Sequence, residues 1–178
     1  QGARIDSFGV GERLITSSSE PVFGGVYKLA AVEDKEGHIT PKIKISETAE
    51  KITTPHLKNL YRIYDKESGK IRADYITLAD ETFDESEDLL LFDPNATWKK
   101  TRLEGGTYTM KEILVPIFKN GQCVYDSPSV MEIQKHCKEQ LETMWEESRR
   151  LVNPQEVFVD LSDKLYEMKK ELLNEVGR

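Results

Sequence analysis

The spacing of apolar residues changes once along the chain, near Ser127. Between residues 21 and 126, apolar residues form short runs or alternate with polar ones, and glycine, proline or asparagine separates the runs. A period of two is typical of β-strands, whose successive side chains point to opposite faces. After Ser127, apolar residues recur every three or four positions, as in an amphipathic helix. The sequence therefore predicts a β-rich region followed by a helical one, an α+β fold.

Two hairpin signals lie within the β-rich region. The first joins strands expected over residues 60–64 and 71–78 through the turn residues 65–69. The second is Asn120-Gly121, which favours a two-residue turn between extended segments. Further strands are expected over residues 26–32, 41–45, 98–103 and 108–118.

Two helices are expected after this region. Ser127 and Pro128 supply an N-cap and a first-turn proline, and Asn153-Pro154 ends the first helix. The second helix is marked by apolar residues over 161–172 and closes at Gly177. One face of the first helix is assigned to the hydrophobic core, and it consists of Val130, Ile133, Cys137, Leu141, Met144 and Trp145.

A glycine turn, Phe8-Gly9-Val10-Gly11, lies near the start of the chain. We interpret it as a short strand, a turn and the first turn of a helix. Glycine lets the backbone take positive φ and approach a ligand closely, and free amides at a helix N-terminus can cradle phosphate. The same pattern is typical of a plain strand-to-loop turn, so the residues alone leave both interpretations open.

Charge is distributed unevenly along the chain. The net charge of −7 disfavours nucleic acid as the main partner. Residues 42–72 nevertheless contain eight basic residues against four acidic ones. Such a basic segment suits a small phosphorylated ligand, although a solvated face of a sheet has the same composition. Strict alternation places Lys42 and Lys44 on one face of their strand, where the two could meet one phosphate.

The sequence contains no conventional catalytic or metal motif. The histidines His38, His56 and His136 form no catalytic dyad by their spacing, and Cys123 and Cys137 belong to no Cys-x-x-Cys pair. No apolar run approaches the ~20 residues of a membrane span. We therefore expect free thiols, no signal peptide and no membrane association, in a cytoplasmic protein.

Three blocks together resemble the C-terminal part of the bacterial nicotinate phosphoribosyltransferases. They are SFGVGERLITS, PVFGGVYKLAAVE and PKIKISETAEKITTPHLKNLYRIYD, and the resemblance continues less distinctively to the end. The family fold pairs an irregular α/β barrel with a β-rich domain. Because a (β/α)₈ barrel needs about 250 residues, we expect this chain to be the C-terminal piece of a longer enzyme.

The resemblance implies a division into three parts. Residues 1–20 would hold the last strand of a type II phosphoribosyltransferase barrel, the phosphate-binding turn and a helix start. Residues 21–126 would form a mostly antiparallel β region, and residues 127–178 a C-terminal region of two helices. A barrel strand needs neighbours, so we expect the isolated chain to be partly disordered near residues 2–8.

The resemblance also implies a reaction and its binding residues. Family members join nicotinate to the ribose of phosphoribosyl pyrophosphate, with Mg²⁺ and ATP hydrolysis, and form nicotinate mononucleotide for NAD salvage. The 5′-phosphate is expected on the amides of Gly9, Val10, Gly11 and Glu12, with help from Arg13. Further anion contacts are expected from Lys42, Lys44, Lys51, Thr53 and Lys58. The family usually has glycine where this chain has His56, and histidine makes that loop backbone less free.

The catalytic residues are expected outside this chain, because the family's phosphorylated histidine belongs to an earlier segment. The piece alone is therefore expected to be inactive and to need the N-terminal part of the same enzyme, in a homodimer implied by the resemblance. Two alternatives stay open. One is a nicotinamide phosphoribosyltransferase with the same fold and loop, and the other is a non-catalytic β-rich binding or assembly module whose glycine turn is structural.

Overall fold

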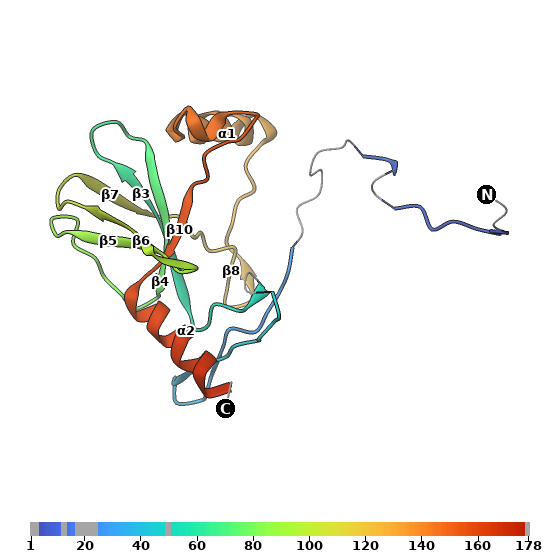
Figure 1. The fold of residues 1–178 in the computed structure, drawn as a ribbon, viewed down its shortest axis with the longest axis horizontal. Coiled ribbons are helices and arrows are strands. Elements are labelled where there is room, and N and C mark those ends of the chain that lie inside the picture. The colour runs from blue at the N-terminus through green and yellow to red at the C-terminus, as the bar shows by residue number, and fades with distance from the viewer. Residues whose placement is uncertain (1–3, 12–13, 17–24, 49–50, 177–178) are drawn as a thin grey trace.

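A central four-stranded sheet organises the computed structural model, which describes residues 4–11, 14–16, 25–48 and 51–176 (Figure 1). The strand order is β10-β4-β3-β7, where β3 is antiparallel to both β4 and β7, and β10 is parallel to β4. The bounds are Lys58–Asp65 for β3, Ile71–Leu78 for β4, Tyr108–Glu112 for β7 and Phe158–Leu161 for β10. The hairpin predicted over residues 60–78 is thereby confirmed.

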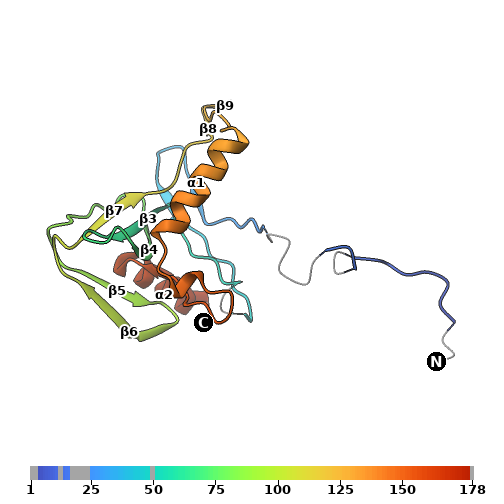
Figure 2. The same ribbon diagram turned by 90° about the horizontal axis from the view of Figure 1, so that it is seen from above.

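A hairpin of β5 (Leu89–Asp93) and β6 (Ala96–Leu103) covers one face of this sheet. Figure 2 shows it across from β3, β4 and β7. The residues buried between the two layers form the first core: Ile63, Ala73, Tyr75, Leu91, Leu103 and Tyr108. Strand β4 contributes the alternate residues Ala73 and Tyr75 to this core, as the period of two requires.

Helix α2 (Asp163–Val176) follows β10 directly and confirms the second predicted helix. A second core joins it to the sheet through Leu78, Leu161 and Leu165. The rings of Phe92 and Tyr166 meet edge to face with centroids 5.1 Å apart, which ties α2 to the β5–β6 hairpin. Strand β4 therefore contributes to both cores.

Helix α1 (Val130–Thr143) departs from the prediction in two ways. Its N-cap is Ser129, two residues later than expected, because Ser129 and Glu132 form a reciprocal capping box. No residue of α1 is buried, so the apolar face assigned to the core lies outside it. The helix is fixed only near its C-terminal end, where Lys70 Nζ donates to the Glu142 carbonyl at 2.7 Å. Figure 1 shows α1 and α2 at opposite ends of the sheet.

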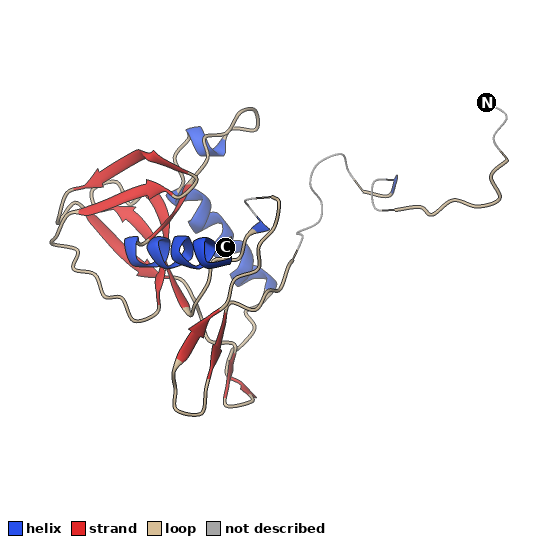
Figure 3. Ribbon diagram, turned by 60° about the horizontal axis from the view of Figure 1, so that its bottom comes forward, coloured by secondary structure: helices blue, strands red, loops and turns tan. Residues whose placement is uncertain are grey.

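Two smaller hairpins complete the described strands. They pair β1 (Ala31–Glu33) with β2 (Ile39–Pro41), and β8 (Phe118–Lys119) with β9 (Gln122–Cys123). Figure 3 shows both of them projecting away from the main sheet. The predicted turn at Asn120-Gly121 is confirmed, with φ of 51° and 76°, both in the left-handed region. A short 3₁₀ helix spans Glu147–Arg149.

Several predicted strands are shorter than expected or absent. The strand expected over 26–32 begins only at residue 31, the one over 41–45 ends at residue 41, and the one over 108–118 is broken after residue 112. Residues 4–8 form no strand and are exposed, because no neighbouring strand among the described residues pairs with them. Within the part of the chain described here, neither helix is long and apolar enough to cross a bilayer.

Candidate phosphate-binding site

The glycine turn is only partly described. Gly9, Val10 and Gly11 are exposed, and the Leu14 amide donates to the Gly11 carbonyl at 3.1 Å, which closes a single turn. Neither Gly9 nor Gly11 takes the positive φ that glycine allows. A Cβ at either glycine would stand in open space. Glu12 and Arg13 lie outside the described residues, so their amides stay a prediction.

The predicted lysines lie on segments that hydrogen bonds hold side by side. The Lys42 amide donates to the Ala30 carbonyl at 2.8 Å, and the Thr53 amide donates to the Lys44 carbonyl at 3.2 Å. Lys28 Nζ donates to the Lys51 carbonyl. The side chains of Lys42, Lys44 and Lys51 are exposed. The three lysines therefore lie on adjacent segments with their side chains open to solvent.

Thr53 is buried beside these lysines, and its exposed fraction is 6%. Its hydroxyl oxygen is shielded from solvent and has no hydrogen-bond partner among the described residues. A buried hydroxyl without a partner costs free energy, so such groups usually meet a water or a ligand. Among the predicted site residues, Thr53 has a buried hydroxyl that is free to bind a ligand or a water.

Lys58 has a different role in this structure from the one expected. Its ammonium donates to the carbonyls of Thr54 at 2.8 Å, Pro55 at 3.3 Å and His56 at 2.7 Å. Partial burial lowers the pKa of Lys58 below its ordinary value. Because an ammonium has three protons, these carbonyls can occupy all of them. Lys58 therefore closes the loop over residues 54–56, and contact with an external anion would require release of one bond.

A second half-buried lysine reaches the same loop from α2. Lys169 Nζ lies 3.4 Å from Thr54 Oγ1, and burial lowers its pKa. The sequence offered no signal for this residue, because it lies 115 positions from Thr54 and looks like any polar residue of an amphipathic helix. The loop is thus held between β3 and α2 by two cations. His56 within it takes φ of 72°, and its amide donates to the Ala30 carbonyl at 2.8 Å.

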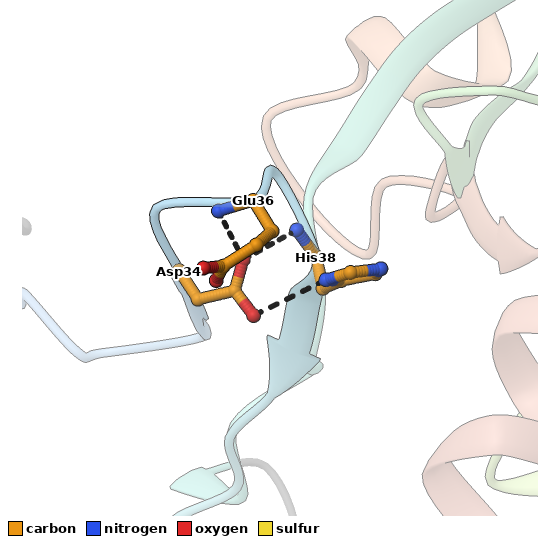
Figure 4. Close-up of side chains that lie close together, drawn as sticks. All are labelled: Asp34, Glu36 and His38. Atoms are coloured by element: carbon orange, nitrogen blue, oxygen red, sulfur yellow. Dashed lines mark hydrogen bonds and ion pairs between the residues drawn. The ribbon is translucent and has the colours of Figure 1, made fainter.

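Asp34, Glu36 and His38 are grouped in the turn between β1 and β2 (Figure 4). Asp34 Oδ1 accepts from the amides of Glu36 at 2.9 Å and His38 at 2.8 Å, and Asp34 Oδ2 lies 3.3 Å from His38 Nδ1. The backbone amide of His38 is the largest cause that lowers the pKa of Asp34. All three residues are exposed. These bonds account for the grouping as a turn stabilised by an aspartate, without a metal ion.

A separate cavity of about 540 Å³ lies between β10, the β5–β6 hairpin and residues 145–157. Trp145 and Phe158 supply aromatic walls, and Trp145 Nε1 donates to the Ile71 carbonyl at 2.7 Å. Asp160 also lines it, and burial together with the nearby charge of Asp93 raises its pKa to about 6. None of the predicted anion contacts lines this cavity. The predicted lysines and this cavity are therefore distinct places on the molecule.

Comparison with known proteins gives one consistent family. Residues 57–169 match the family model for the nicotinate phosphoribosyltransferase C-terminal domain. The chain is 38% identical over 176 residues to nicotinate phosphoribosyltransferase of Bacillus subtilis. This alignment covers 99% of this chain and 35% of that protein. It is 33% identical over 168 residues to nicotinate phosphoribosyltransferase of Caenorhabditis elegans, in an alignment that covers 94% of this chain and 29% of that protein.

A solved structure has the same fold. The crystal structure of human nicotinic acid phosphoribosyltransferase aligns with a TM-score of 0.66 and 23% identity over 90% of this chain and 30% of that one. The chain spans about a third of the length of the curated relatives it matches. Since the family model covers more than half of its residues, the chain belongs to the nicotinate phosphoribosyltransferase C-terminal domain family.

Proposed function

We propose that this chain acts as the C-terminal domain of a nicotinate phosphoribosyltransferase, which forms nicotinate mononucleotide and pyrophosphate from nicotinate and phosphoribosyl pyrophosphate. The observation that carries the proposal is the match to the Bacillus subtilis enzyme over nearly the whole chain. Coupling to ATP hydrolysis, a cytoplasmic location and a homodimer belong to the same proposal.

The domain's part in this reaction is to bind anionic groups of the substrate. The amides of Gly9, Val10, Gly11 and Glu12 would hold the 5′-phosphate, with Arg13 beside them, because backbone amides at the start of a helical turn favour anions. Lys42, Lys44 and Lys51 would add positive charge. The unpartnered hydroxyl of Thr53 supports this assignment, since a phosphate oxygen would supply its missing bond.

The residues proposed here do not fit a magnesium site. Mg²⁺ prefers carboxylate and phosphate oxygens in octahedral geometry, whereas this group consists of amides, ammonium groups and one hydroxyl. Magnesium chemistry is therefore assigned to none of these residues. Displacement of pyrophosphate develops positive charge on the ribose, so the domain contributes by holding the anionic end of the substrate in position.

The test uses the protein encoded by the complete reading frame that contains these residues. Incubation with nicotinate, phosphoribosyl pyrophosphate, Mg²⁺ and ATP should give nicotinate mononucleotide, and a parallel reaction contains nicotinamide. Product from nicotinamide alone would assign the chain to a nicotinamide phosphoribosyltransferase. Product from neither base would favour a non-catalytic module.

Two variants of that protein test the anion contacts. Gly11→Val adds a side chain in open space, so the fold should persist while the KM for phosphoribosyl pyrophosphate rises. The double variant Lys42→Gln, Lys44→Gln should raise the same KM several-fold, because it removes two charges near the substrate. Lys164→Gln is the control, since this exposed lysine lies on α2, and its KM should be unchanged.

A further inference from the structure

Every residue from 114 to 139 is exposed, although this segment contains the β8–β9 hairpin and most of α1. Ordered elements that bury nothing are unusual, because apolar burial is the main stabilising contribution of a hairpin or an amphipathic helix. The segment also carries many large apolar side chains: Leu114, Val115, Ile117, Phe118, Val124, Tyr125, Val130, Met131 and Ile133. We call it the exposed segment.

The apolar residues of α1 form a continuous stripe. Val130, Ile133, Cys137 and Leu141 follow one another at intervals of three or four, so they share one face. Val130 is 80% exposed and Ile133 is 53% exposed. Contiguous exposed apolar surface of this kind marks an interaction site. Figure 1 shows α1 at the top of the molecule, with β8 well below it; Figure 2 shows α1 from above.

The relatives indicate what covers this surface. The match to the Bacillus subtilis enzyme includes 99% of the chain, so the exposed segment belongs to the shared domain and is not an insertion. About two thirds of that enzyme lies outside the match. In the relatives, therefore, this segment is tethered to a larger polypeptide, and tethering greatly raises the effective concentration of that partner.

We infer that the exposed segment is the docking surface for the polypeptide that corresponds to the N-terminal two thirds of nicotinate phosphoribosyltransferases. This inference rests on the proposed function for the identity of the partner. The stripe on α1 packs against apolar residues of the partner, and the exposed apolar residues around the hairpin β8–β9 pack against it at a second place. The alternative occupant is a second copy of this domain.

The chain's own thiols report on this contact. Cys137 lies within the stripe and is free and exposed. Its alkylation by iodoacetamide is compared between the 178-residue chain and the protein encoded by the complete reading frame, with Cys123→Ser in both. Alkylation of Cys137 should be slowed more than about tenfold in the complete protein, because a thiol buried in an interface reacts only when the contact opens. In a matched control, Cys137→Ser with His136→Cys places a thiol off the stripe, and its rate should be the same in both proteins.

Equal Cys137 rates in the two proteins would overturn the inference. Slow alkylation in the 178-residue chain that becomes fast on dilution would overturn it in favour of a second copy. The variants Ile133→Asp and His136→Asp make the same charge change on and off the stripe, and only Ile133→Asp should restore rapid alkylation in the complete protein. The alkylation experiment uses no substrate, so its result does not depend on enzymatic activity. If the complete protein lacks the proposed activity but protects Cys137, the proposed function is refuted and the docking surface is supported.

Discussion

His56 holds its backbone in the left-handed region, with φ of 72°. Residues with a Cβ pay roughly 1–2 kcal/mol there, while glycine pays almost none. The hydrogen bond from the His56 amide to Ala30 and the bond from Lys58 to the His56 carbonyl explain why the loop keeps this conformation. The hydrogen bonds of the loop backbone, and not the imidazole side chain, therefore set this backbone conformation.

His56→Gly is expected to stabilise the 178-residue chain by about 1 kcal/mol, measured by urea unfolding, because it relieves this backbone strain. His56→Ala removes the imidazole but keeps the Cβ, so it should bring no gain. Equal stabilisation by both variants would show that the side chain, and not the backbone, is the source of the strain.

Asp160 is buried on β10 next to the charge of Asp93, and its pKa is about 6 instead of 3.8. Lys99, Lys100 and Arg72 also line the same cavity, with Glu147 and Glu156. A raised carboxyl pKa means that the folded state holds its proton more tightly than the unfolded state. The stabilising contribution of protonated Asp160 is complete below pH 3.8 and is lost as the pH rises through 6.

Asp160→Asn should therefore raise the free energy of unfolding at pH 7.5 by up to about 3 kcal/mol, at roughly 1.4 kcal/mol per pKa unit. At pH 3, below both pKa values, the variant and the parent should be equally stable. The measurement is urea unfolding at both pH values, and Asp126→Asn on the exposed segment is the control. A gain that is the same at both pH values would contradict the assignment to this carboxyl.

At the scale of elements, the sequence predicted those features that depend only on neighbouring residues. The turns at residues 65–69 and 120–121 were predicted because their residue types dictate the backbone. The parallel pairing of β10 with β4, which sets Phe158 opposite Ala73, was not predicted, because nothing near residue 158 specifies a partner so far away. The face of α1 was assigned to the core because periodicity reveals an apolar stripe but not what covers it.

The same limit applies to the candidate site. Lys42 and Lys44 were predicted as anion contacts from their alternation, and Lys51 from the resemblance. The structure brings their segments together, while their role as anion contacts stays a prediction. Lys169 was missed because its contact with Thr54 depends on how α2 packs. The bonds from Lys58 to three carbonyls likewise depend on the loop conformation, which the positive φ of His56 determines.

Gly105 connects β6 to β7, and it is needed for a steric reason. A Cβ there would stand 2.0 Å from the Ser86 carbonyl oxygen, which belongs to the backbone and cannot easily move away. The Gly105 amide also donates to Asp88 Oδ1 at 2.8 Å, which fixes its position. Gly105→Ala should therefore destabilise the chain by about 3 kcal/mol in urea unfolding. Gly25→Ala, which meets nothing within 4 Å, should change the midpoint little, and equal effects of the two would contradict the steric explanation.

At the scale of the whole molecule, the described chain has two regions of different stability. The two cores share β4, which contributes Ala73 and Tyr75 to one and Leu78 to the other, so they should unfold together. The exposed segment contributes no buried residue to either core. Local unfolding is least costly where few apolar contacts are lost. In the 178-residue chain, α1 should therefore open while the sheet stays folded.

Hydrogen exchange with two matched substitutions tests this division. Leu165, on α2, is fully buried, so Leu165→Ala should lower global stability by about 2–4 kcal/mol and speed exchange in β3 and β4. Leu141 on α1 is 44% exposed, so Leu141→Ala should leave β3 and β4 unchanged and speed exchange only in α1. Slowed exchange across α1 in the complete protein would mean that its partner supplies the missing core, whereas α1 amides that already exchange as slowly as those of β4 in the short chain would refute the division.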